Sequence, residues 1–90
     1  MSLTKLITDR LRERLHPTEL EVTDESHQHH GHAGWREEGE THFRLDIVSG
    51  AFEGKSRIER HRLVNEVLAE AFDRGLHALA IKARAPGEQP

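Results

Sequence analysis

The residues best suited to chemistry in this sequence are histidines. The chain has 90 residues, of which eight are histidine and none is cysteine. Four of the histidines lie close together, as His27, His29, His30 and His32. Neutral imidazole is a ligand for zinc, copper, iron and nickel, so this cluster predicts a metal site. The spacing does not choose among the four side chains. The alternative interpretation is a solvated polar segment that binds metal only adventitiously.

A further histidine, His61, lies within a predicted helix. It precedes Val64 by three residues and Leu68 by seven, which places it along the apolar stripe of that helix rather than opposite it. A lone histidine in such a position is usually a core residue held by one hydrogen bond. Because it is near the helix start, and therefore near an end of the sheet, it could also meet a loop.

Three arginines, Arg57, Arg60 and Arg62, form a basic cluster around His61. They could receive a phosphate, the backbone of DNA or an acidic partner surface. The alternative is a solvated face in which Arg62 pairs with Glu66 one helical turn away. The formal net charge of −3 opposes any general attraction of nucleic acid or of an anionic membrane.

Composition and missing motifs exclude several classes of protein. The absence of cysteine excludes disulfides, thiol catalysis and metal sites built only from thiolates. The sequence has no glycine-rich phosphate loop, no HExxH motif and no nucleophile elbow, so we expect a protein that is not an enzyme. No apolar run approaches the roughly 20 residues that span a bilayer. Without a secretory signal either, we expect a cytoplasmic protein that does not engage membranes.

The first helix and the strands follow from hydrophobic periodicity. An amphipathic helix is predicted over residues 2–16, because its apolar residues recur at helical spacing and Pro17 follows. Alternation of apolar and polar residues predicts short strands at 20–23, 41–49 and 77–83. The apolar face of the helix consists of Leu3, Leu6, Ile7, Leu11 and Leu15.

A second helix is predicted between the last two strands. Ser56 and Glu59 have the spacing of a capping box, and the helix should run to about Arg74 and end at Gly75. The polar segment 24–40, which carries the four clustered histidines, is predicted to be a long loop. The apolar stripe of the second helix consists of Ile58, Val64, Val67, Leu68, Ala71 and Phe72.

The predicted order is therefore α-β-β-α-β, an α+β fold. The first two strands can pair antiparallel across the long loop, and the helix between the last two strands suits a crossover that leaves them parallel. Both helices should then pack on one face of a three-stranded mixed sheet. We expect one domain over residues 1–85 and a polar, disordered C-terminal tail over residues 86–90.

Several separated motifs resemble the signature of the BolA family. The family pattern F-x-G-x-S followed by R-H-R-x-V is similar to Phe52-Glu53-Gly54-Lys55-Ser56 and Arg60-His61-Arg62-Leu63-Val64. Its D-E-S-x-x-H motif is similar to Asp24–His29, its entry to the second strand to Thr41–Phe43, and its final strand to His77–Ile81. The resemblance extends over residues 2–84 in one order, and it implies a BolA-like domain with a fold similar to the type II KH domain.

The resemblance also implies a function. BolA proteins pair with monothiol glutaredoxins, and a 2Fe–2S cluster is held by the glutaredoxin cysteine, by glutathione and by ligands of the BolA protein. By similarity, those ligands are His61 in R-H-R and His29 in the loop, with His27, His30 and His32 as alternatives at the loop position.

Other functions stay open at this point. Some BolA proteins act as transcriptional regulators, so a KH-like nucleic-acid-binding module that uses Arg57, Arg60 and Arg62 is the first alternative. A histidine-rich zinc-binding protein is the second. DNA is the partner that the first alternative implies. A second copy of the chain, in a weak homodimer, is a separate candidate partner.

Overall fold

The computed structural model describes residues 2–25 and 42–88. The first helix, α1 (Leu3–Leu15), forms where the apolar spacing predicted it, and its five apolar positions are all buried. The Ser2 side chain accepts a hydrogen bond from the backbone N–H of Lys5 at 3.1 Å, which caps the helix start. His16 ends the helix with a φ of 45°, and Pro17 cannot continue it.

Three strands, β1 (Glu19–Asp24), β2 (His42–Val48) and β3 (Ala78–Arg84), form one sheet in that spatial order. β1 pairs antiparallel with β2, and β2 pairs parallel with β3, as the connection lengths predicted. A short 3-10 helix, η2 (Gly50–Phe52), follows β2 and leads toward the second helical region.

The second helical region consists of two pieces. α2 (Arg57–Val67) begins with the predicted capping box, and α3 (Ala69–Asp73) follows after a break at Leu68. In the capping box the backbone N–H of Glu59 donates to Ser56 Oγ at 3.2 Å, and the Ser56 N–H donates to the Glu59 carboxylate at 2.8 Å. The prediction of a single helix to Arg74 is corrected to a helix with a break.

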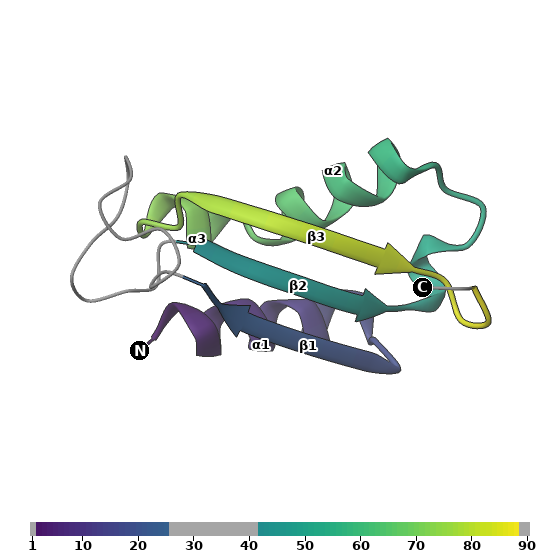
Figure 1. Cartoon of the computed structure of the whole chain (residues 1–90), viewed down its shortest axis with the longest axis horizontal. Helices are drawn as coiled ribbons and strands as arrows, with labels where there is room; N and C mark the ends of the chain where they lie inside the picture. The colour runs from purple at the N-terminus through teal and green to yellow at the C-terminus, as the bar shows by residue number, and fades with distance from the viewer. Residues whose placement is uncertain (1, 26–41, 89–90) are drawn as a thin grey trace.

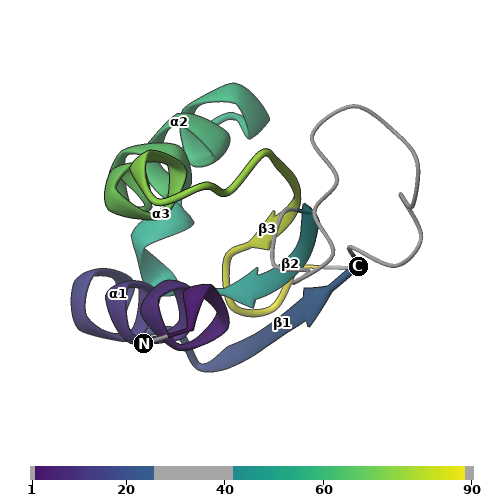
Figure 2. The same ribbon diagram turned by 90° about the vertical axis from the view of Figure 1, so that its left-hand side faces the viewer.

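All helices lie on one face of the sheet, as Figures 1 and 2 show. The core fills the space between the helices and this face, where the alternating side chains of the strands meet the helix stripes. Two residues of the predicted α2–α3 stripe are not buried: Ile58 is 63% exposed and Phe72 is 36% exposed. At about 100° of rotation per residue, Ile58 points roughly 120° away from Val64 and cannot share its face.

The C-terminal segment is partly ordered. Residues 86–88 form a turn, in which the N–H of Glu88 donates to the Ala85 carbonyl at 3.1 Å. The Glu88 carboxylate then contacts Arg60 on α2. The expectation of a disordered tail is therefore corrected for residues 86–88, whereas residues 89–90 lie outside the described part of the chain.

Candidate functional site

All three strands meet at the end of the sheet from which segment 26–41 departs. β1 stops there at Asp24, whereas β2 starts there at His42 and β3 starts there at Ala78 (Figure 1). The backbone N–H of Glu25 donates to the His42 carbonyl at 2.7 Å, which extends the ladder by one bond. A side chain at the start of β2 or β3 therefore lies beside the two points where segment 26–41 is attached.

Two histidines come together at this end of the sheet. The ring centroids of His42 and His77 are 5.2 Å apart, with 54° between the ring planes. Their proximity follows from the parallel register, because His42 pairs with Ala78 and His77 is the residue before it. His42 is only 6% exposed, whereas His77 is exposed. An exposed imidazole that rests on a buried one can offer a nitrogen to a metal held outside the chain.

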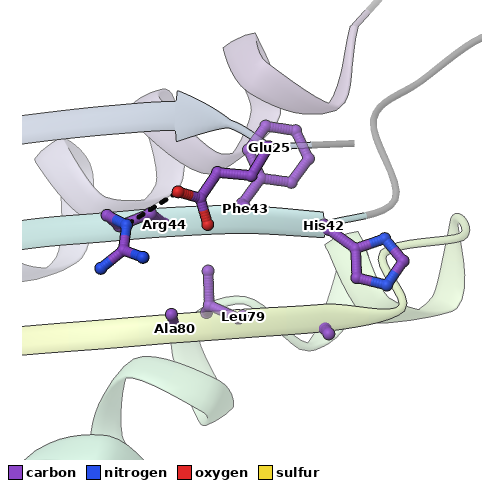
Figure 3. Close-up of a pocket in the computed structure, with 7 residues that line it drawn as sticks. Glu25, His42, Phe43, Arg44, Leu79 and Ala80 are labelled. Atoms are coloured by element: carbon purple, nitrogen blue, oxygen red, sulfur yellow. Dashed lines mark hydrogen bonds and ion pairs between the residues drawn. The ribbon is translucent and has the colours of Figure 1, made fainter. Parts of the chain in front are cut away.

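A pocket of about 360 Å³ adjoins the His42 ring. Figure 3 shows Glu25 reaching over β2 toward Arg44, whose Nε donates to the carboxylate at 2.8 Å. This hydrogen bond raises the pKa of Arg44 above its ordinary value. The Glu25 side chain is mostly buried, whereas the Arg44 side chain is 63% exposed. The lining residues are Glu25, His42, Phe43, Arg44, Ala78, Leu79 and Ala80.

The four clustered histidines, His27, His29, His30 and His32, lie outside the described residues. Within residues 2–25 and 42–88, no group of three or more histidine, cysteine, aspartate or glutamate side chains is arranged to hold a metal. The described part of the chain thus offers at most part of a ligand set at the His42–His77 end. Further ligands have to come from segment 26–41 or from another molecule.

His61 lies elsewhere. It is half-buried on α2 and lines a groove of about 460 Å³ beside the C-terminal half of β3, so it is not a core residue. Another lining residue, Ala83, pairs with Ile47, and the distance along β2 from His42 to Ile47 is about 17 Å at roughly 3.3 Å per residue.

The reason for this placement is the direction of the crossover. α2 begins at the end of the sheet where β2 and β3 finish (Figure 1). His61 is therefore near an end of the sheet, as the sequence predicted, but it is the end opposite to the attachment of segment 26–41. His61 and the two attachment points of segment 26–41 therefore lie at opposite ends of the sheet, whereas His77 lies beside those attachment points.

The arginine cluster does not form one free cationic surface. Arg60 is 13% exposed and its guanidinium pairs with the carboxylate of Glu88 at 2.6 Å. Arg57 is exposed and lines the same groove as His61, whereas Arg62 is exposed and does not belong to that lining. Of the three predicted contact residues, only Arg57 and Arg60 therefore share a site.

Sequence reasoning missed His77 and His42 as site residues and assigned both to local roles in the sheet. A signal for them was present. Two histidines that start consecutive parallel strands must lie at the same end of the sheet, next to any loop that enters there. The pairing of His42 with Ala78 supplies the register that the sequence alone left open.

Residues 11–88 match the protein family described as BolA-like. The match covers most of the chain, including both histidine-bearing strand starts and the groove beside α2. The chain belongs to the BolA-like family. The BolA signature predicted from the separated motifs is thereby confirmed.

Relatives of known sequence agree with this assignment. The chain is 54% identical over 89 residues to an uncharacterized protein in the cobS 5' region of Sinorhizobium sp., and it covers 96% of that protein. It is 51% identical over 86 residues to SufE-like protein 1, chloroplastic/mitochondrial, of Arabidopsis thaliana, but spans only 23% of that relative. Against BolA-like protein 1 of Homo sapiens the identity is 46% over 82 residues, and the chain spans 57% of the relative.

Solved structures give the same fold. The BolA domain of SufE1 from Arabidopsis thaliana superposes with a TM-score of 0.88 at 48% identity, covering 99% of this chain and 98% of that one. BolA1 from the same plant gives 0.83 at 45% identity, covering 97% and 95%. These likenesses confirm the α+β fold with a three-stranded mixed sheet. None of the helices in the described ranges has the length and apolar character needed to cross a bilayer.

Proposed function

We propose that this BolA-like chain is a non-enzymatic adaptor that pairs with a monothiol glutaredoxin and completes the binding of a 2Fe–2S cluster through histidine. The processes it would serve are iron–sulfur cluster assembly, trafficking or iron regulation, and the proposed location is the cytoplasm. Family membership supports the class of protein. The observation that carries the site is the contact between His42 and His77 where the histidine-rich segment is attached.

The donor set of this chain fits a shared cluster. The glutaredoxin and its glutathione each supply a thiolate, so the remaining ligands can come from a chain that has no cysteine of its own. Such a site needs only one or two imidazoles from this chain. Imidazole in place of thiolate lowers the negative charge of the cluster and raises its potential.

His77 is the proposed ligand on the folded domain. It is exposed at the start of β3, whereas His42 is 6% exposed and would have to leave its place to reach a cluster on another molecule. His42 is accordingly proposed to hold the His77 ring in place. His29 is the proposed second ligand, with His27, His30 and His32 as alternatives, because all four belong to the segment attached beside His77.

The experiment is anaerobic co-purification of the chain with a monothiol glutaredoxin and glutathione, followed by visible absorption and circular dichroism. The wild-type heterocomplex should show a cluster spectrum that differs from that of the glutaredoxin alone. His77→Ala should abolish this difference, and His29→Ala should weaken it. His61→Ala is the matched control, because it removes an imidazole from the opposite end of the same domain and should leave the spectrum unchanged.

Each alternative result has a definite meaning. Loss of the spectrum in His61→Ala with retention in His77→Ala would return the ligand assignment to the R-H-R motif. A wild-type chain that never joins the glutaredoxin would defeat the adaptor proposal altogether. Tight binding of zinc by the free chain in that case would favour the histidine-rich zinc-binding function instead.

Nucleic-acid binding is the second candidate, and one observation favours it: basic side chains line the groove beside α2. Arg57 and Lys82 are exposed there. The net charge of the chain is nevertheless −3, and a phosphate would have to displace Glu88 from Arg60. A gel shift at physiological salt tests this candidate, because binding that survives only at low salt is general attraction to phosphate.

A further inference from the structure

Arg60 is held as a ready-made receptor for a carboxylate. Its Nε donates to the Lys55 carbonyl at 2.9 Å, and its Nη1 donates to the Ala83 carbonyl at 3.3 Å. The backbone thus fixes the guanidinium from both sides of the groove. Its outward edge holds the carboxylate of Glu88 through two bonds, of 2.6 Å and 2.9 Å. Such paired, charge-assisted bonds are the geometry that arginine uses to recognise carboxylates.

The groove around Arg60 contains more positive charge than Glu88 can balance. Glu88 is the only acid in the lining described for this groove. Arg84 Nη2 forms an ion pair with Asp46 Oδ1 at 3.2 Å. The Nε of Arg84 is buried and has no hydrogen-bond partner among the described residues. The basic residues that line the groove are Lys55, Arg57, Arg60, His61, Lys82 and Arg84, and its apolar floor is Ile81 and Ala83.

The carboxylate now in the groove comes from a short turn and is partly exposed. Glu88 follows a tight turn in which Gly87 adopts a φ of 86°, and Glu88 also accepts a hydrogen bond from the Ala85 N–H at 2.9 Å. Its side chain is nevertheless 42% exposed. The Arg60–Glu88 ion pair is therefore open to solvent on the side of Glu88.

We infer that this groove is a binding site for an acidic peptide segment of a partner protein, and that Glu88 is the chain's own occupant of its central position. Together the arginine fork, the surrounding cations and the apolar floor suit carboxylate side chains on a peptide. A nucleic-acid backbone would instead need an extended cationic track on a chain whose net charge is −3. The groove lies at the opposite end of the sheet from His42 and His77, so this inference is independent of the proposed cluster site.

The test uses the full chain, labelled with nitrogen-15, and an acetylated and amidated hexaglutamate peptide as the probe at physiological salt. In the wild type, the peptide can bind only to the fraction of molecules in which Glu88 has left the groove, so its apparent dissociation constant is the intrinsic one divided by that fraction. Glu88→Gln should therefore bind the peptide about fivefold or more tightly than wild type. Glu66→Gln removes the same charge from an exposed position on α2 outside the groove lining and should stay near the wild-type value.

Two further measurements test the groove even if Glu88→Gln alone folds poorly. In the wild-type chain, saturating peptide should shift the amide signals of Ala85 and Glu88, since displacement of the carboxylate breaks the hydrogen bond between them. Adding Lys82→Gln to Glu88→Gln should weaken peptide binding again, with the circular dichroism spectrum unchanged.

Several outcomes would overturn the inference. Equal gains from Glu88→Gln and Glu66→Gln would show that only overall charge matters. Binding of duplex DNA to the groove at physiological salt, with no response to the peptide, would assign the groove to phosphate. Failure of Glu88→Gln to bind the peptide at all would show that Arg60 and Glu88 form only a structural ion pair.

Discussion

The imidazole rings of His42 and His77 lie 5.2 Å apart although they are far apart in the sequence. The contact exists because β2 and β3 run parallel from the same end of the sheet, with His42 opposite Ala78. One ring is buried and the other is exposed. In the proposed site, His77 is the ligand and the buried ring behind it sets its orientation.

We predict that His42→Phe destabilises the bound cluster without preventing its assembly. Phenylalanine fills the buried site but has no ring nitrogen, so the ring contact proposed to position His77 is changed. Loss of a residue that orients a metal ligand usually costs about 10–100-fold in metal affinity. The measurement is the rate at which the visible circular dichroism of the heterocomplex decays after a chelator is added. His16→Asn, at the C-cap of α1, is the control, and an unchanged rate in His42→Phe would contradict the positioning role.

The capping box at the start of α2 gives a stability prediction. Ser56→Ala removes the oxygen that accepts from the Glu59 N–H and should lower the free energy of unfolding by about 1 kcal/mol. Urea unfolding followed by circular dichroism measures this change. Ser56→Thr keeps the hydroxyl and should retain most of the stability, so equal losses in both variants would argue against the cap.

Much of the fold could be predicted from the sequence because its signals are local. The apolar face of α1, its Ser2 cap and the capping box at Ser56 depend on residues within one or two turns, and all three are confirmed. The break at Leu68 and the exposure of Ile58 were not predicted. The exposure of Ile58 follows from helix geometry, because the residue points roughly 120° away from Val64, whereas nothing in the apolar spacing marks the break at Leu68.

The site was harder to predict because it requires motif positions to be combined with strand direction and register. The parallel pairing predicted for the last two strands already implies that the helix carrying His61 begins at the end of the sheet where those strands finish. The observed register shows that His77, rather than His61, lies at the attachment of segment 26–41. The side chains of His27, His29, His30 and His32 lie outside the described residues, and the ligand on the folded domain is likewise untested, so both ligands stay predictions.

A buried hydroxyl joins α1 to the end of β2 and gives a second stability prediction. Ser49 is fully buried, and its Oγ donates to the Leu15 carbonyl at 2.5 Å and accepts from the Ala51 N–H at 3.1 Å. Ser49→Ala leaves both backbone groups without this partner, which should cost about 1–3 kcal/mol of unfolding free energy. Urea unfolding should show a lower midpoint with an unchanged slope. A loss no larger than that of the exposed cap variant Ser2→Ala would contradict this role.

The ion pair between Arg60 and Glu88 predicts how stability responds to acid. The pKa of Glu88 is lowered from 4.5 to about 2, first by the hydrogen bonds from Arg60 and then by the Ala85 N–H. Because the unfolded chain binds the proton more readily, the pair stabilises the fold above the ordinary carboxyl pKa, and its contribution is lost as the pH falls toward about 2.

Replacing Glu88 by Gln removes the ionisable group, so the variant should lack this share of the pH dependence. Urea midpoints measured near pH 5.5 and near pH 3 should therefore fall further in wild type than in Glu88→Gln. The pKa values of Glu59 and Glu70 are also lowered by their hydrogen-bond partners, so some acid sensitivity should persist in the variant. Glu66→Gln should keep the full wild-type difference. If Glu88→Gln and wild type lost the same amount on acidification, Arg60 would not be holding the Glu88 carboxylate in solution.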